Sequence, residues 1–139
     1  MKRPSNLRQH RILLVDDEPD VTLTLKKGLE ENGFSVDAFN DPKAALSNFK
    51  AAYYDLLLVD IKMADLNGVQ LYQEIKKKGN SAKVCFITAY EVYYDRLKED
   101  YPTLNVGCFI KKPVETEASN SQKFQSIKEA SSDRSPQIR

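Results

Sequence analysis

The segment LLLVD at residues 56–60 decides the fold class, because four consecutive aliphatic residues lead directly into an acid. A strand with one face in water alternates apolar and polar residues, whereas an unbroken apolar run is typical of a strand covered on both faces. The segment RILLV at 11–15 has the same character, and KVCFI at 83–87 and VGCFI at 106–110 repeat it later in the chain. Such strands occur mainly in parallel sheets that helices cover on both sides.

Helical patterns separate these strands. Pro19 suits the first turn of a helix, which the asparagine and glycine at 32–33 end. Apolar residues recur between these points at four-residue spacing: Val21, Leu25 and Leu29. Further predicted elements are a strand at 34–39 and helices that begin at Pro42, after Gly68 and at about Glu91. This alternation predicts an α/β fold with a doubly wound, five-stranded parallel sheet and helices on both faces.

Polar side chains stand where the predicted strands end: Asp16, Asp17, Asp60, Thr88 and Lys112. Ligands of doubly wound sheets bind beyond the carboxyl ends of the strands, so we expect these side chains to share one rim. Three clustered carboxylates repel one another unless a cation joins them. A donor set of oxygen atoms without His or Cys favours Mg²⁺ over Zn²⁺.

The position of Asp60 indicates a chemical role. It ends the third of five predicted strands, which places it near the centre of the sheet. A carboxylate can attack phosphorus and form an aspartyl phosphate. In that hypothesis Asp16 and Asp17 hold the metal, while Asp60 both binds the metal and attacks. Thr88 and Lys112 would then satisfy the additional negative charge of the phosphoryl group.

The chain resembles the receiver domains of two-component response regulators, the chemotaxis regulator among them. The resemblance rests on four motifs, which are ILLVDDEPD at 12–20, LLLVDIKMADLNG at 56–68, ITAY at 87–90 and FIKKP at 109–113. They occur in the family's order and cover roughly residues 11–113. The resemblance implies the flavodoxin-like strand order 2-1-3-4-5 and Mg²⁺ as cofactor. It also implies a histidine kinase or a phosphotransfer protein as the phosphodonor.

The resemblance assigns roles to individual residues. The metal ligands that it implies are Asp16, Asp17, Asp60 and the backbone carbonyl of Lys62. Asp60 is implied as the phosphoacceptor, Thr88 and Lys112 as phosphate-binding residues, and Thr88 with Phe109 as the switch pair. Lys62 and Tyr90 lie two residues beyond Asp60 and Thr88, so we expect them to flank the acyl phosphate and to set its lifetime.

Two other functions stay open at this point. One is an adaptor with a receiver-like fold that is never phosphorylated, against which the full set of polar residues argues. The other is a haloacid-dehalogenase-like phosphatase with an aspartyl nucleophile. Such phosphatases need an acid two residues after the nucleophile, where this chain has Lys62. We therefore expect no enzyme, only a domain that catalyses its own phosphorylation and dephosphorylation.

Composition narrows the partners and the location. The formal net charge of +1 gives no reason to expect nucleic acid or an anionic membrane as partner. No apolar run approaches the roughly 20 residues of a membrane span, and the N-terminus lacks the apolar stretch of a secretory signal. We therefore predict a cytoplasmic location. Four of the seven tyrosines lie between residues 90 and 101, so the predicted helix at 91–101 is a candidate surface for an unknown downstream protein.

The two cysteines, Cys85 and Cys108, lie in apolar strand-like runs and in no CxxC or metal-ligand spacing. We interpret both as small buried hydrophobic residues rather than as a redox pair.

Three segments are expected along the chain: a basic leader at 1–10, the receiver domain at 11–129 and a disordered tail at 130–139. After residue 113 the large apolar residues are few: Val114, Phe124, Ile127 and Ile138. The last helix of the domain is therefore weakly specified. No effector segment follows, so we expect a stand-alone receiver with no DNA-binding output.

Overall fold

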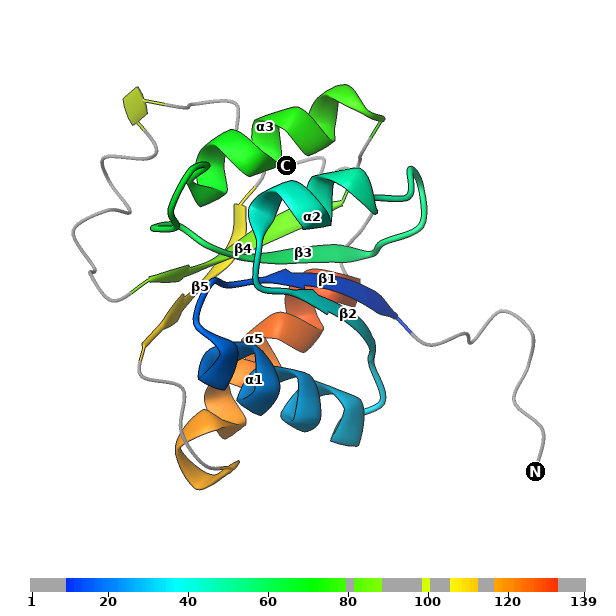
Figure 1. Ribbon diagram of the computed structural model, residues 1–139. Coiled ribbons are helices and arrows are strands. Elements are labelled where there is room, and N and C mark those ends of the chain that lie inside the picture. The colour runs from blue at the N-terminus through cyan, green and yellow to red at the C-terminus, as the bar shows by residue number, and fades with distance from the viewer. Residues whose placement is uncertain (1–9, 80–81, 89–98, 101–105, 113–116, 133–139) are drawn as a thin grey trace.

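The computed structural model describes residues 10–79, 82–88, 99–100, 106–112 and 117–132. The strands in this part of the chain are β1 (Arg11–Val15), β2 (Ser35–Phe39), β3 (Leu56–Asp60), β4 (Lys83–Thr88) and β5 (Val106–Lys111). They form one parallel sheet in the order β2-β1-β3-β4-β5 (Figure 1). The predicted α/β fold and the flavodoxin-like strand order are confirmed.

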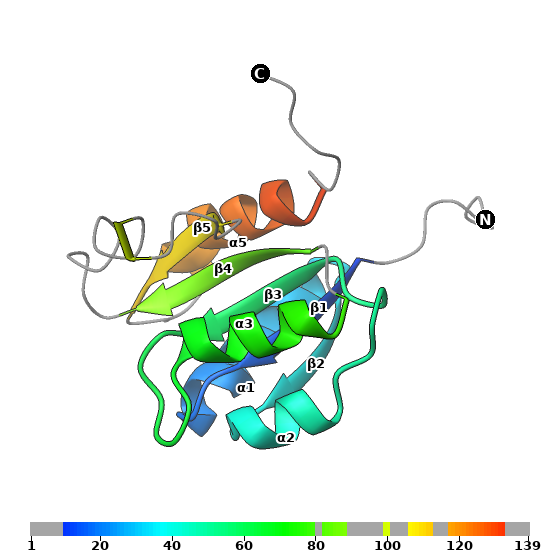
Figure 2. The same ribbon diagram turned by 90° about the horizontal axis from the view of Figure 1, so that it is seen from above.

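Helices cover both faces of this sheet. They are α1 (Pro19–Glu31), α2 (Pro42–Ser47), α3 (Gly68–Lys77) and α5 (Glu117–Ser132). Figures 1 and 2 show α2 and α3 on one face of the sheet and α1 and α5 on the other. The helix predicted at 91–101 lies almost entirely outside the described residues. Within the described part of the chain, no helix is long and apolar enough to cross a bilayer.

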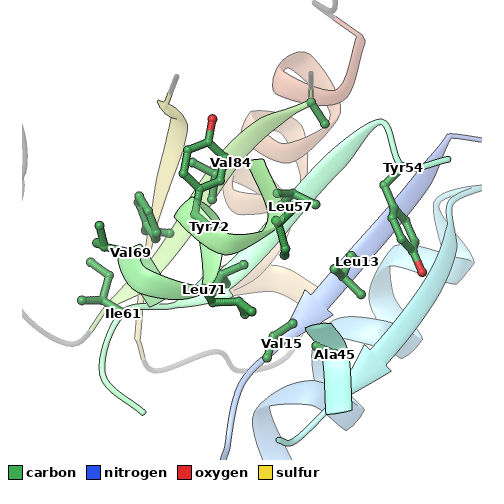
Figure 3. Packing of buried hydrophobic residues seen from close by; sticks show 14 residues of the cluster. Leu13, Val15, Ala45, Tyr54, Leu57, Ile61, Val69, Leu71, Tyr72 and Val84 are labelled. Carbon is green, nitrogen blue, oxygen red and sulfur yellow. The ribbon is translucent and has the colours of Figure 1, made fainter. Parts of the chain in front are cut away.

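The core is divided by the sheet into two apolar layers. Leu13 of β1, Leu57 of β3 and Leu71 of α3 lie in the layer beneath α2 and α3 (Figure 3). Leu14 and Leu58 point the other way and pack with the residues of α1 and α5. Because successive strand residues face opposite sides, a strand between two such layers must be apolar at every position. This requirement explains the unbroken runs of β1 and β3.

Cys85 and Cys108 differ from expectation. They lie opposite each other in the register of β4 and β5, and their sulfur atoms form a disulfide with Cα atoms 4.5 Å apart. The interpretation of the two as separate buried hydrophobic residues was therefore wrong. The two cysteines pair because β4 and β5 are neighbours in the sheet. They are 23 residues apart in the chain, so no local spacing motif predicts the bond.

The C-terminal helix differs from expectation at its end. α5 continues to Ser132, so residues 130–132, which were assigned to a disordered tail, are helical and the helix ends three residues later than expected. Ala130 and Ser131 are buried. His10, placed in the leader by the sequence analysis, is half-buried, and its Nδ1 lies 3.1 Å from the Ser131 hydroxyl. This end of the helix has no wide apolar stripe. Small buried residues and one polar contact pack it against the rest of the domain instead.

Candidate functional site

Three carboxylates meet at the carboxyl end of the two central strands. β1 and β3 are neighbours, so Asp16 and Asp17, which follow β1, lie beside Asp60, the last residue of β3. Their carboxylate oxygens lie within 4.8 Å of one another. Asp16 and Asp60 are buried, whereas Asp17 is exposed. The residues that the strand-end rule selected are therefore brought together in space.

The backbone around Asp16 is fixed by several hydrogen bonds. The Glu18 N–H donates to Asp16 Oδ1 at 2.9 Å, and the Asn40 amide donates to the Asp16 carbonyl oxygen at 2.8 Å. The other carboxylate oxygen, Oδ2, is buried, and its contact with the Lys112 Nζ at 3.2 Å does not have the geometry of a hydrogen bond. Buried carboxylate oxygens normally have a partner, so Asp16 Oδ2 has spare coordinating capacity that points into the cluster.

Lys112 supplies positive charge to the cluster. Its Nζ lies 3.2 Å from Asp16 Oδ2 and 3.4 Å from Asp60 Oδ2, and it also contacts a carboxylate oxygen of Glu18. The Lys112 N–H donates to the Thr88 carbonyl oxygen at 2.9 Å, which fixes the lysine beside the end of β4. One ammonium group thus serves several carboxylates at once.

The electrostatic imbalance of the site appears in the pKa values. Burial raises the pKa of Asp60 to about 7, and the negative charge of Asp16 adds to the effect although Lys112 opposes it. Burial likewise raises the pKa of Asp16. Burial alone would lower the pKa of Lys112, but its hydrogen bond to Glu18 and the charges of Asp16 and Asp60 raise the value. The cluster therefore favours an additional proton or an additional cation.

A hard divalent cation fits this cluster. The donors offered by Asp16, Asp17 and Asp60 are all carboxylate oxygens, which are the ligands that Mg²⁺ prefers. The buried Asp16 Oδ2, which has only an ion pair with poor hydrogen-bond geometry, is one of them. Asp17 Oδ2 accepts a weak hydrogen bond from the Ala64 N–H at 3.4 Å, so the loop after β3 already approaches the acids. Lys62 lies in the same loop with an exposed side chain, and its carbonyl as a metal ligand stays a prediction.

The predicted switch residues lie on β4 and β5. Asp60 pairs in register with Ile87, so Thr88 is the next residue along β4 at the same rim, and its side chain is buried. Phe109 on β5 is half-buried, and its ring centroid lies 6.0 Å from that of Phe86. Tyr90, the other predicted lifetime residue, lies outside the described residues.

Two residues of the site were not assigned from the sequence. Glu18 contacts Lys112, and the only sequence signal for it is its place directly after the acid pair. Gly68 packs so tightly on β3 that a Cβ atom at this position would collide with the Asp60 carbonyl group. Its N–H donates to the Ile61 carbonyl oxygen at 2.8 Å, which folds the loop after β3 back over the strand end.

Known proteins are similar to this chain. The family model of the response regulator receiver domain matches residues 12–121. The transcriptional regulatory protein TctD of Salmonella typhimurium is 35% identical over 109 residues, which are 77% of this chain and 47% of TctD. The chain therefore spans about half the length of that relative.

Solved structures of receiver proteins have the same fold. The non-phosphorylated HemR receiver domain from Leptospira biflexa is similar with a TM-score of 0.77 and 26% identity, over 94% of this chain and all of that one. The response regulator TrrA from Thermotoga maritima, solved in complex with Mg²⁺-BeF, is similar with a TM-score of 0.67 and 30% identity. That second comparison covers 85% of this chain and 99% of TrrA.

Proposed function

The chain belongs to the response regulator receiver domain family, and we propose that it accepts a phosphoryl group on Asp60 in a Mg²⁺-dependent reaction. The observation that carries this proposal is the buried Asp60 carboxylate at the end of the central strand, with two further acids and Lys112 around it. Receiver domains act in two-component signalling, so the phosphoryl group is a signal rather than an intermediate of metabolism.

The proposed step is a displacement at phosphorus. A carboxylate oxygen of Asp60 forms a bond to the phosphorus atom of the donor, while the bond from phosphorus to the donor's nitrogen or oxygen breaks. Such a transfer depends on positioning and on charge stabilisation. The Lys112 Nζ lies 3.4 Å from Asp60 Oδ2, so it can form an ion pair with the phosphoryl oxygens once they are attached to Asp60. Mg²⁺ held by Asp16, Asp17, Asp60 and the Lys62 carbonyl would neutralise the remaining charge.

The signal is proposed to pass along β4 and β5. The Thr88 hydroxyl moves toward the phosphoryl oxygens, and the Phe109 ring turns into the space that is vacated. A phenylalanine needs no hydrogen-bond partner in the buried state, and its neighbour Phe86 offers an apolar contact on that side. Lys62 and Tyr90 are proposed to shield the acyl phosphate from water, since neither is a credible general base near neutral pH.

The partners of the domain are proposed on the same grounds. The donor is a histidine kinase or a phosphotransfer protein, and the reaction takes place in the cytoplasm. The net charge of +1 gives the chain no general attraction for nucleic acid. We therefore propose that a protein surface reads the switch.

Incubation of the full chain with Mg²⁺ and acetyl phosphate, followed by intact-mass measurement, tests the proposal. The expected result is one phosphoryl adduct on the parent protein, none on Asp60→Asn and none when Mg²⁺ is chelated. Asp65→Asn is the matched control, because this exposed aspartate lies in the loop after β3 at φ 70°, which asparagine also adopts. Rapid release of phosphate without an adduct would identify a phosphatase, and an unchanged mass with unchanged donor would identify an adaptor.

A further inference from the structure

The cysteine pair in β4 and β5 is unused by the proposed phosphoryl chemistry. Cys85 and Cys108 are direct register partners, and their Cα atoms are 4.5 Å apart. Disulfides span Cα separations of about 4.4–6.8 Å. The neighbouring strands therefore hold both sulfur atoms where a bond can form or break without a shift in the backbone of β4 or β5.

The two cysteines differ in their exposure to solvent. Cys85 is fully buried, whereas Cys108 is half-buried on the strand at the edge of the sheet. Both belong to the apolar layer on the side of α1 and α5, together with Ile127 of α5. An external thiol or disulfide can therefore reach Cys108 first, and Cys85 is placed to act on Cys108 from within.

Helix α5 covers this pair with few large side chains. Ile127 is fully buried in the same layer, and Phe124 is half-buried against α1, so tightly that a Cβ atom at Gly28 would collide with its ring. Beside Cys108, Gly107 allows Ala130 to approach the strand closely. The described side chains of α5 in this layer are thus few and closely packed, so the docking of α5 is sensitive to the space that the two sulfur atoms occupy.

We propose that Cys85 and Cys108 form a reversible redox site that exchanges with small disulfides and small dithiols. In its oxidised state, the site stabilises the packing of α5 on the sheet. Two sulfur atoms without a bond between them need a larger separation than two bonded ones. Reduction must therefore push side chains apart in a dense core, and α5, which places fewer large side chains in this layer than α1, is the element that gives way.

The exchange proceeds in two displacements that balance. The Cys108 thiolate attacks one sulfur of the small disulfide, whose other sulfur leaves as a thiolate and takes a proton. The Cys85 thiolate then attacks the Cys108 sulfur and releases the second small thiol. Two protein thiols are thereby oxidised to one disulfide, and the small disulfide is reduced to two thiols. Reduction by a dithiol is the reverse sequence. In the reducing cytoplasm that we propose for this protein, such a bond would form only transiently, as a sensor.

Glutathione tests the order of the two steps. In the full-length Cys85→Ala protein, oxidised glutathione should leave one glutathione attached to Cys108, because no second thiol completes the exchange. The Cys108→Ala protein should react about tenfold more slowly, because Cys85 is reached only through a local opening of the structure. Intact mass measured over time gives both rates. Equal rates in the two variants would overturn the assigned order.

The parent protein tests reversibility. Dithiothreitol should reduce the folded chain and excess oxidised glutathione should restore the bond, as alkylation and mass measurement report. The bridge closes a loop of 23 residues in sequence separation, so the melting temperature of the oxidised form should be about 10 °C higher. Cys108→Ala should show no such difference between the two conditions. A bond that resists dithiothreitol until the protein unfolds, or thiols that stay free in oxidised glutathione, would overturn the redox site.

Amide hydrogen exchange tests the effect on α5. Reduction should accelerate exchange severalfold in Glu117–Ser132, while α3 (Gly68–Lys77), on the opposite face of the sheet, should keep its rate. The same α5 exchange in both redox states would refute the coupling of the bridge to the helix, whatever the thiol chemistry showed.

Discussion

Strands β3 and β5 lie in the same sheet but are held in place by different means. All five residues of β3 are buried, between β1 and β4. β5 lies at the edge beyond β4, and Ile110 is the one fully buried residue of its six. Around β5 the close approach of Gly107 to Ala130 and the bridge at Cys108 add to the apolar contacts of Ile110 and Phe109. Hydrophobic burial therefore stabilises the centre of the sheet, whereas close backbone contacts and one disulfide contribute more at this edge.

This difference matters for the site, because both regions contribute to it. Asp60 ends the fully buried β3, which suits a nucleophile that must be positioned before the donor arrives. Phe109 belongs to the less buried β5, and Lys112 directly follows that strand. Phe109, whose ring is proposed to turn during switching, thus comes from the part of the sheet with fewer packing constraints. The contrast between centre and edge predicts how substitutions will act.

The largest expected effect compares one side chain in the two regions. Val84 of β4 and Val106 of β5 are register partners, but Val84 is fully buried, beneath α3 (Figure 3), and Val106 is half-buried. Val84→Ala should lower the free energy of unfolding by about 2.5 kcal/mol, the sum of two lost methyl groups and a residual cavity. Val106→Ala should cost about 1 kcal/mol. Urea unfolding of both variants measures this pair, and equal losses would remove the distinction between centre and edge.

The second effect concerns the charge buried at the end of β3. The pKa of Asp60 is about 7 in the folded chain, above the value of about 3.9 in an unfolded chain. Stability from this group is therefore full below about pH 4 and is lost as the pH rises to 7. Without Mg²⁺, Asp60→Asn should stabilise the protein at pH 8 by about 2 kcal/mol, since each pKa unit corresponds to about 1.4 kcal/mol and structural relaxation around a buried charge reduces its full cost.

At pH 4 the same Asp60→Asn substitution should be nearly neutral, and saturating Mg²⁺ should reverse its sign at pH 8. Thermal unfolding at the two pH values, with and without Mg²⁺, measures both differences. A variant that is less stable than the parent at pH 8 without Mg²⁺ would show that the ionised Asp60 carboxylate does not destabilise the fold.

The contrast between centre and edge also explains what could be predicted from the sequence. Burial on both faces leaves a continuous apolar run, and the carboxyl end of such a run locates a site residue, so β3 and Asp60 were predictable. The apolar run VGCFI at 106–110 likewise predicted β5, but no pattern marks the contacts between β5 and α5. Gly107, Ala130 and Ser131 act through close approach, which depends on the neighbouring element and not on their own spacing.

Two further features needed the structure for a related reason. The Cys85–Cys108 bridge depends on the register between two strands far apart in the chain. Glu18 became part of the site only because the lysine after β5 reaches across to it. In the sequence it is one acid among several, and an acid before a proline at a helix start is equally compatible with a solvent-exposed position.

The third effect tests close approach at the edge. A Cβ atom at Gly107 would lie 2.9 Å from the Ala130 Cβ and 3.4 Å from the side chain of Lys83. Gly107→Ala should therefore push α5 outward and cost about 1.5 kcal/mol, in the range of overpacking substitutions. Combining it with Ala130→Gly should restore part of the loss. Urea unfolding of the single and double variants measures the coupling, and strict additivity would show that the two positions do not press on each other.

The smallest expected effect lies at the last turn of α5. The Ser131 hydroxyl is buried, lies 3.1 Å from His10 Nδ1 and donates to the Lys128 carbonyl oxygen at 2.9 Å. Ser131→Ala leaves the half-buried imidazole nitrogen without this partner, so we expect a loss of about 1 kcal/mol. Because the contact joins the helix end to the residue before β1, amide exchange should increase in residues 128–132 more than in residues 123–127. His10→Ala, which removes the same contact without a change in the helix, controls for the change in helix propensity. Exchange in residues 128–132 that stays at the parent rate in His10→Ala would mean that the bridge and Ile127, and not this polar contact, determine where α5 ends.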